Sequence, residues 1–363
     1  MRLEDFEMGE WEKFVVGRLL GEKEMNQLLT GLKICKLHII CGLLCVSLFG
    51  CKNSTTQKPD ISKGSETVQI PVFSGDSAWS FVQKQVSFGP RVPGTPAQTA
   101  CADWLAGKFR SYGADVIVQQ ANIKVYDGIK VPMKNIIARF QPEKSNRILL
   151  MAHWDSRPFA DQDPDPAKRD LPIDGANDGG SGAGVLLEIA RGLQKQPTQL
   201  GIDLILFDVE DYGAPAHRVP DGKPEDWGLG SQYWAKNPHI TGYFARYGIL
   251  LDMVGAPNAV FTMEEVSRFY AQSVLDKVWQ AGNNLGYGQY FSYQKTPQLI
   301  DDHRFVNEII GIPSIDIIQN DAYTESSFGS TWHTQSDNLS NINRQTLTAV
   351  GRTLFRVIYD ERQ

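Results

Sequence analysis

Histidines and acidic residues recur in this chain directly after short apolar runs, in a pattern that can bind a metal ion. The positions are the His153-Trp154-Asp155 triplet, Asp178 in a Gly-Ala-Asn-Asp sequence, the Asp208–Asp211 cluster, Asp252, the Asp301–His303 triplet and His333. Each has an ordinary explanation by itself, because an aspartate before a helix caps it or complements its dipole, and a loop histidine is often solvated. Two or three carboxylates with one histidine, leaving a position open for water or substrate, suit catalytic zinc. The repetition therefore favours a zinc site.

Alternating helices and strands can bring these residues together. Helical spacing of apolar residues predicts helices over 77–86, 96–112, 182–193, 269–284 and 343–360. Apolar runs predict strands over 114–118, 135–140, 147–153, 201–207, 247–254 and 312–318. Such strands, separated by helices, form a sheet that is buried on both faces. We expect one α/β domain with a central, mostly parallel but mixed and twisted sheet, flanked by helices on both faces, and with its chemistry beyond the carboxyl ends of the strands.

The composition is that of a folded globular protein and argues against several classes. Of the 363 residues, 42% are hydrophobic and 21% are charged, which is too apolar for a disordered chain. The formal net charge is -6, whereas nucleic-acid binders carry excess Lys and Arg to neutralise phosphates, so no nucleic-acid partner is expected. No fixed-period repeat is present, which sets solenoids and propellers aside.

The N-terminal region has the features of an export signal. Residues 37–49 are largely apolar, follow Lys33 and Lys36, and are shorter than the roughly 20 residues that span a bilayer. Cys51 directly follows Gly50, which resembles the bacterial lipobox, so we expect Cys51 to be lipidated. A plain signal anchor or a first helix of the fold is the alternative. The expected location is the membrane, through the lipid anchor, with the rest of the protein in the periplasm.

The domain organisation follows from this interpretation. Residues 25–50 are the predicted signal peptide, and the highly charged residues 1–24 are an upstream extension that we doubt is part of the native protein. The polar residues 51–72 are a predicted tether, which leaves 73–363 as the catalytic domain. Of the five cysteines, only Cys101 lies in that domain, so it can form no internal disulfide.

Taken in order, the motifs resemble the zinc aminopeptidase family that also contains the animal-type glutaminyl cyclases. The resemblance runs from His153 to Thr334 and extends N-terminally through the FGPRVPG sequence at 88–94. Within the family, Asp301 and Trp332 are typical of cyclases, where aminopeptidases have Ser before the Asp-His pair and Tyr or Ile before the final His. The chain therefore resembles bacterial zinc-dependent glutaminyl cyclases. The resemblance implies conversion of N-terminal glutamine in peptides and proteins to pyroglutamate, with release of ammonia.

The same resemblance implies roles for individual residues. Asp178, Asp211 and His333 would bind one zinc ion, and Glu210 would be the general acid and base. Glu210 and Asp211 are adjacent, and their two roles can exchange. Position 211 is Asp where animal cyclases have Glu, which still offers a carboxylate oxygen.

Further residues would complete the active site. Asp252 and Asp301 would form a hydrogen-bonded carboxylate pair. Trp332 and Phe328 would line the pocket for the glutamine side chain, and Trp227 would add another wall.

Two residues and two departures from the family pattern concern the surroundings of the metal. His153 and Asp155 would either bind a second metal ion or form hydrogen bonds around the first site. Asp316 stands where animal cyclases carry a histidine, and Ala152 replaces one cysteine of a pair that they have.

Two rival functions remain open. The first is a two-zinc aminopeptidase, because His153 and Asp252 can hold a second ion. The second is a non-catalytic lipoprotein that uses the same fold as a binding module. The long polar loops 158–173 and 212–226 flank the predicted site, and the sequence does not decide among a lid, a partner surface and a tolerated insertion. We expect a monomer.

Overall fold

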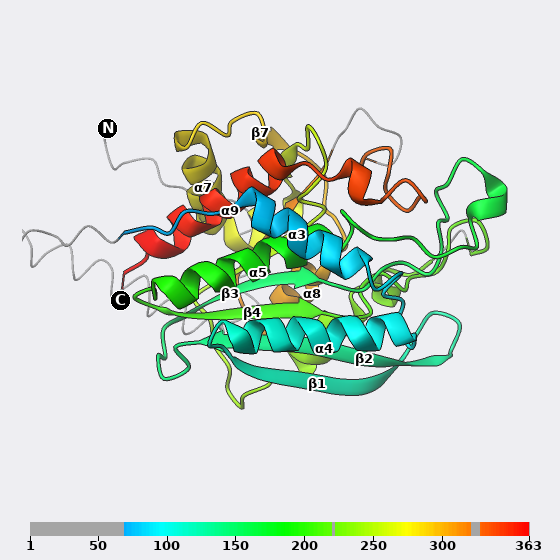
Figure 1. Ribbon diagram of the computed structural model, residues 1–363, viewed down its shortest axis with the longest axis horizontal. Coiled ribbons are helices and arrows are strands. Elements are labelled where there is room, and N and C mark those ends of the chain that lie inside the picture. Colours follow the sequence, from blue (N-terminus) through cyan, green and yellow to red (C-terminus); the bar gives the residue numbers. More distant parts are fainter. Residues whose placement is uncertain (1–68, 220–221, 321–326, 363) are drawn as a thin grey trace, which may run out of the picture. The chain divides into compact units, whose positions relative to one another are not determined.

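The computed structural model describes residues 69–219, 222–320 and 327–362 (Figure 1). The predicted signal peptide, Cys51 and most of the predicted tether lie outside these residues. Within the described ranges, no helix has both the length and the apolar character needed to cross a bilayer. Phe73, where the catalytic domain was predicted to begin, is buried. Its ring packs edge-on against Phe355, with the ring centroids 5.8 Å apart.

A six-stranded mixed sheet forms the centre of the described chain (Figure 1). Its strand order is β1-β2-β4-β3-β5-β8, with β1 and β2 antiparallel to their neighbours and β4, β3, β5 and β8 parallel. The strands are β1 (Asp115–Lys124), β2 (Lys130–Phe140), β3 (Arg147–His153), β4 (Gly201–Phe207), β5 (Gly248–Asp252) and β8 (Ser314–Ile318). A separate parallel pair is formed by β6 (Phe261–Met263) and β7 (Phe291–Lys295).

Side chains that alternate along the central strands enter two different hydrophobic clusters, because successive residues of a strand point to opposite faces. In β3, Ile148 and Leu150 join one cluster, whereas Leu149 and Met151 join the other. All seven residues of this strand are buried. A strand buried on both faces shows continuous apolar character, which is why β3 and β4 could be located from the sequence.

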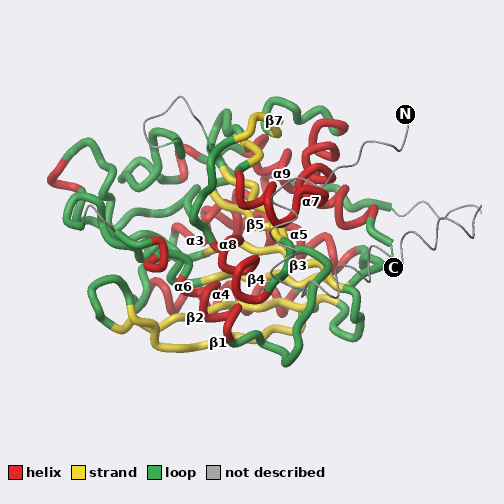
Figure 2. Tube along the Cα trace, turned by 180° about the vertical axis from the view of Figure 1, so that it is seen from behind, coloured by secondary structure: helices red, strands yellow, loops and turns green. Residues whose placement is uncertain are grey.

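Helices cover both faces of this sheet. The first cluster includes side chains of α3 (Gly75–Val86), α4 (Pro96–Ser111), α5 (Gly180–Lys195), α7 (Glu265–Asn284) and α9 (Arg344–Asp360). Figure 2 shows α6 (Leu229–Lys236) and α8 (Asp302–Phe305) in front of the sheet when it is viewed from behind. The predicted fold class, a mostly parallel mixed sheet with helices on both faces, is confirmed.

Short elements were not predicted from the sequence. They are β6, β7, α6 and α8, each of eight residues or fewer. Such segments carry too few residues for a helical or alternating apolar pattern to stand out. The loop 158–173 contains one 3-10 turn, Pro166–Lys168, and the described part of 212–226 contains another, Pro224–Asp226. Neither the first loop nor the described residues of the second form a longer element.

Close packing of α5 on the sheet gives a testable consequence at Gly182. A Cβ atom there would lie 2.4 Å from the backbone oxygen of Leu251 and 2.9 Å from the Cβ of Ala152. Gly182→Ala should lower the free energy of unfolding by about 1–3 kcal/mol, because overpacking against backbone cannot be relieved by a rotamer change. Gly107→Ala, with nothing within 4 Å of its Cβ, is the control and should be neutral or stabilising. Urea denaturation measures both, and equal stability of the two variants would contradict this packing argument.

Candidate active site

Asp178, Asp211 and His333 meet at the carboxyl end of the sheet, as the sequence predicted. They come from the turn before α5, the segment after β4 and the loop before α9, and all three are buried. The Nε2 atom of His333 lies 3.3 Å from Oδ1 of Asp211 and 3.7 Å from Oδ2 of Asp178. Ligands of a tetrahedral zinc ion, each about 2.0–2.1 Å from the metal, stand about 3.3 Å apart. The spacing of the three side chains therefore fits such an ion.

Both carboxylates of this group have one oxygen atom that makes no hydrogen bond. Oδ2 of Asp178 and Oδ2 of Asp211 are buried and make no hydrogen bond to any described residue. Burying a carboxylate oxygen without a hydrogen bond or a cation is costly, so native structures rarely leave one unsatisfied. Their oxygen donors, with an imidazole nitrogen, are a set that zinc accepts. The described residues thus form a candidate metal site.

The geometry distinguishes Glu210 from Asp211 as candidates for binding the metal and for transferring protons. Asp211 belongs to the potential metal-binding group with Asp178 and His333, and Glu210 does not. Burial raises the pKa of Glu210 well above its usual value; the charge of His153 opposes this shift, and that of Asp301 adds to it. A carboxyl group with a raised pKa is suited to exchange protons near neutral pH. The arrangement favours Asp211 as the ligand and Glu210 as the acid and base.

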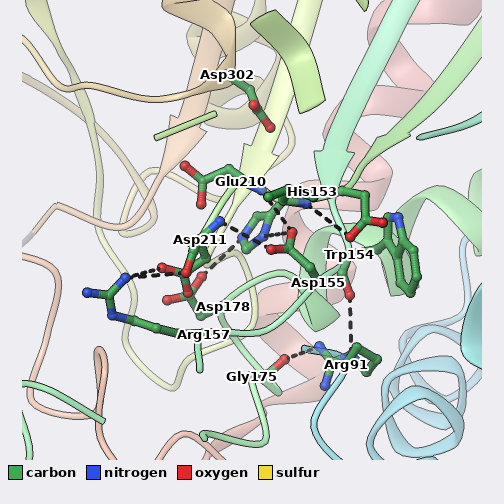
Figure 3. Close-up of polar contacts among 12 residues, drawn as sticks. Arg91, His153, Trp154, Asp155, Arg157, Gly175, Asp178, Glu210, Asp211 and Asp302 are labelled. Carbon is green, nitrogen blue, oxygen red and sulfur yellow. Dashed lines mark hydrogen bonds and ion pairs between the residues drawn. The ribbon is translucent and has the colours of Figure 1, made fainter. Parts of the chain in front are cut away.

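Asp155 connects the ends of two neighbouring strands (Figure 3). Its Oδ1 lies 3.4 Å from Nδ1 of His153 and accepts a 3.2 Å hydrogen bond from the backbone nitrogen of Glu210. Its Oδ2 accepts a 3.2 Å hydrogen bond from the backbone nitrogen of Asp211. Val209, directly before Glu210, has φ of 57°, which is strained for a β-branched residue. Asp155 therefore holds the segment after β4 in the conformation that directs Glu210 and Asp211 into the site.

A second potential metal-binding group shares Asp178 with the first and adds His153 and Asp252. Nε2 of His153 lies 3.0 Å from Oδ1 of Asp178 and 3.0 Å from Oδ1 of Asp252. Burial lowers the pKa of His153, but its three carboxylate partners outweigh that effect and raise it well above the usual value. A protonated imidazole satisfies these carboxylates without a second ion. The same three residues are also the ligand set expected of a two-metal aminopeptidase.

Asp301 lies at the start of α8 and lines a cavity together with Glu210 and Asp252. Burial and the charge of Asp252 raise the pKa of Asp301 to about 6. Behind it, Nδ1 of His303 lies 3.6 Å from Oδ2 of Asp316, and Nε2 of His303 lies 3.1 Å from Oε1 of Glu264. Asp316, which stands in the place of a histidine of the animal cyclases, therefore has a histidine as its neighbour.

An open cavity of about 330 Å³ lies above the metal-binding group. The predicted pocket residues Trp227, Phe328 and Trp332 all line it. The rings of Trp332 and His333 stack with their centroids 3.7 Å apart, and Trp227 lies parallel to His333 at 5.9 Å. Aromatic walls around a few polar groups are typical of a site for a small side chain.

Several supporting residues were missed by the sequence reasoning. Arg91 is fully buried and donates hydrogen bonds to the backbone oxygens of Trp154 and Gly175, which joins the end of β3 to the loop before Asp178 (Figure 3). Asp337 accepts hydrogen bonds from the backbone nitrogens of Asn177 and Asp178. Arg157 and Asp161 were also missed. Arg91 lies within the FGPRVPG motif, which was the one available indication.

The fold and the site define an α/β domain with a candidate metal centre of carboxylates and histidine, and comparison with known proteins identifies the family. The model of peptidase family M28 matches residues 135–358, and the chain belongs to this family. The structure of Tannerella forsythia glutaminyl cyclase is 52% identical, with a TM-score of 0.79, and the match covers 80% of this chain and 100% of that one. A Zn-dependent exopeptidase from Parabacteroides distasonis is 51% identical, with a TM-score of 0.79 and coverage of 81% and 100%.

A more distant relative supports the same family resemblance. Glutaminyl-peptide cyclotransferase of Gloydius blomhoffii is 24% identical over 296 residues, which are 73% of this chain and 75% of the relative. The resemblance to zinc-dependent glutaminyl cyclases that the motifs indicated is confirmed.

Substitution of the two adjacent acidic residues separates their roles. Asp211→Asn should lower zinc affinity by more than the roughly 10–100-fold that loss of an outer partner of a ligand costs. Glu210→Gln should retain zinc, because Glu210 is outside the metal-binding group. Metal analysis of both purified variants, after dialysis against a weak chelator, measures the zinc content. Loss of zinc from Glu210→Gln, with retention by Asp211→Asn, would reverse the assignment.

Proposed function

We propose that this protein is a glutaminyl-peptide cyclotransferase that converts N-terminal glutamine of peptides and proteins to pyroglutamate and releases ammonia. The observation that carries the proposal is the placement of Glu210 and Asp301, both with raised pKa values, in an aromatic-walled cavity above three metal-binding side chains. The open cavity of about 330 Å³ has room for a glutamine side chain. The high identity to glutaminyl cyclases over their full length supports the same activity.

In the proposed reaction, Asp178, Asp211 and His333 would hold one zinc ion. Zinc would supply Lewis-acid polarisation of the γ-carboxamide carbonyl. Glu210 takes a proton from the α-amine as the bond between the amine nitrogen and the γ-carboxamide carbon forms. The bond from that carbon to the amide nitrogen then breaks, and Glu210 returns the proton to the departing ammonia.

Other residues of the chain orient the substrate and hold protons. Trp227, Phe328 and Trp332 enclose the methylene groups of the glutamine side chain and exclude water from it. The predicted hydrogen bond between Asp252 and Asp301 is not formed, because Oδ1 of Asp252 pairs with His153 and Oδ1 of Asp301 accepts from the backbone nitrogen of Asp302. The charge of Asp252 nevertheless raises the pKa of Asp301, so the two carboxyl groups influence each other's protonation.

The rival reaction is removal of the N-terminal residue by a two-zinc aminopeptidase. The group of His153, Asp178 and Asp252 favours it, since these side chains can hold a second ion beside the first. Asp301 and Trp332 favour the cyclase instead. The two reactions give different products from the same peptide.

We also propose that the protein is exported and anchored by lipid at Cys51, with residues 51–72 as the tether and the domain from Phe73 in the periplasm. The lipobox-like sequence before Cys51 supports this location. Cys51→Ser should release the protein from the membrane fraction of cells. Retention of the variant in that fraction would argue for the plain signal anchor.

The activity can be tested with the purified domain and a glutaminyl peptide. Protein from about Lys52 onward should release ammonia and give a product lighter by one ammonia. Removal of metal by a chelator should abolish the reaction, and zinc should restore it, because charge stabilisation by the metal is required. Ammonia assay and mass spectrometry report the products. Release of free glutamine would identify an aminopeptidase, and no change to any of several peptides would favour the binding module.

A further inference from the structure

Three consecutive residues of the loop 158–173 contact the segment that carries His333. Oδ1 of Asp161 lies 3.2 Å from Nδ1 of His333. The backbone nitrogen of Gln162 donates a 3.1 Å hydrogen bond to the backbone oxygen of His333, and Oδ2 of Asp163 accepts one of 3.0 Å from the backbone nitrogen of Gln335. His333 itself has φ of 53°, a conformation that surrounding contacts must maintain. The loop therefore holds this segment in place.

Arg157, just before the loop, links Asp161 to a second metal-binding residue. Its Nε and Nη2 donate hydrogen bonds of 2.7 Å and 2.9 Å to the two carboxylate oxygens of Asp161. Its Nη1 donates one of 3.2 Å to Oδ1 of Asp211 (Figure 3). The guanidinium carbon lies 4.7 Å from the centroid of the Trp227 ring. The fully buried Arg157 thus contacts Asp161, the metal-binding residue Asp211 and the cavity wall formed by Trp227.

These contacts determine which atoms of the two ligands remain available. The negative charge of Asp161, 3.2 Å from Nδ1 of His333, favours the tautomer with hydrogen on Nδ1, which leaves the lone pair of Nε2 for a metal. Arg157 donates a hydrogen bond to Oδ1 of Asp211, which keeps a further lone pair, and Oδ2 of Asp211 is buried without a hydrogen bond to any described residue. The forked contact of Arg157 fixes the position and the plane of the Asp161 carboxylate, and the remaining guanidinium nitrogen, Nη1, holds Oδ1 of Asp211.

We propose that Arg157 and Asp161 are positioning residues that set the affinity of the site for zinc, with Asp161 orienting the imidazole of His333 and Arg157 orienting the carboxylate of Asp211. The stacking of Arg157 on Trp227 couples the metal site to the wall of the substrate cavity. This assigns to the loop 158–173 the role of a structural clamp on the metal site. The expected changes in KM and kcat rest on the proposed function, whereas the expected changes in zinc affinity do not.

Asp161→Asn tests the inference directly in the purified protein. Zinc affinity, measured by competition with a chromophoric chelator, should fall by about 10–100-fold, because the neutral amide removes the negative charge that faces Nδ1 of His333. The visible spectrum of the cobalt-substituted protein should also change. The matched control is Asp170→Asn in the same loop, because Asp170 pairs with His217 and Arg218 at the surface. The control should keep the wild-type affinity and spectrum.

Arg157→Lys is the second variant, and it keeps the positive charge if Asp161→Asn fails to fold. It loses the forked contact, so zinc affinity should fall and, at saturating zinc, KM for a glutaminyl peptide should rise more than kcat falls. Circular dichroism of the metal-free proteins establishes which variants are folded. Wild-type zinc affinity in a folded Asp161→Asn or Arg157→Lys protein would overturn the inference. A wild-type protein that binds zinc tightly but forms no pyroglutamate would instead contradict the proposed function alone.

Discussion

The burial of several carboxylates in one cavity is the constraint on which the rest of the site depends. Asp178, Glu210, Asp211, Asp252 and Asp301 all line the same 330 Å³ space. Buried carboxylates repel one another and lose their hydration, so they require protons, cations or donors. Three features meet this requirement. Some carboxyl groups have raised pKa values and so hold protons more readily, others pair with buried cationic side chains, and three side chains are arranged to bind a metal ion.

The fold makes such crowding possible because β3, β4 and β5 run parallel and end at the same edge of the sheet. The backbone is strained where the chain leaves that edge, since Val209 and Met253 have φ of 57° and 47°. Val209 directly precedes Glu210 and Asp211, and Met253 directly follows Asp252, so each strained residue adjoins acidic side chains that line the cavity. The cost is offset by specific contacts, such as the hydrogen bonds from the segment after β4 to Asp155.

Local patterns predicted much of this arrangement. The continuous apolar runs 147–153 and 201–207 correspond to β3 and β4 residue for residue, because strands buried on both faces need no alternation. The residues after those strands could be assigned to one site because parallel strands share an edge. Arg157 and Asp161 could not be recognised in the same way. Their partners Asp211 and His333 are distant in the sequence, and an arginine in a polar loop ordinarily lies at the surface.

We propose that Asp178, Asp211 and His333 bind one zinc ion and that His153 acts as a hydrogen-bonding group. Anomalous diffraction from crystals of the zinc-loaded protein, recorded on both sides of the zinc absorption edge, tests it most directly. We expect a single anomalous peak among those three side chains. A second peak of similar height among His153, Asp178 and Asp252, or a lone peak there, would contradict it.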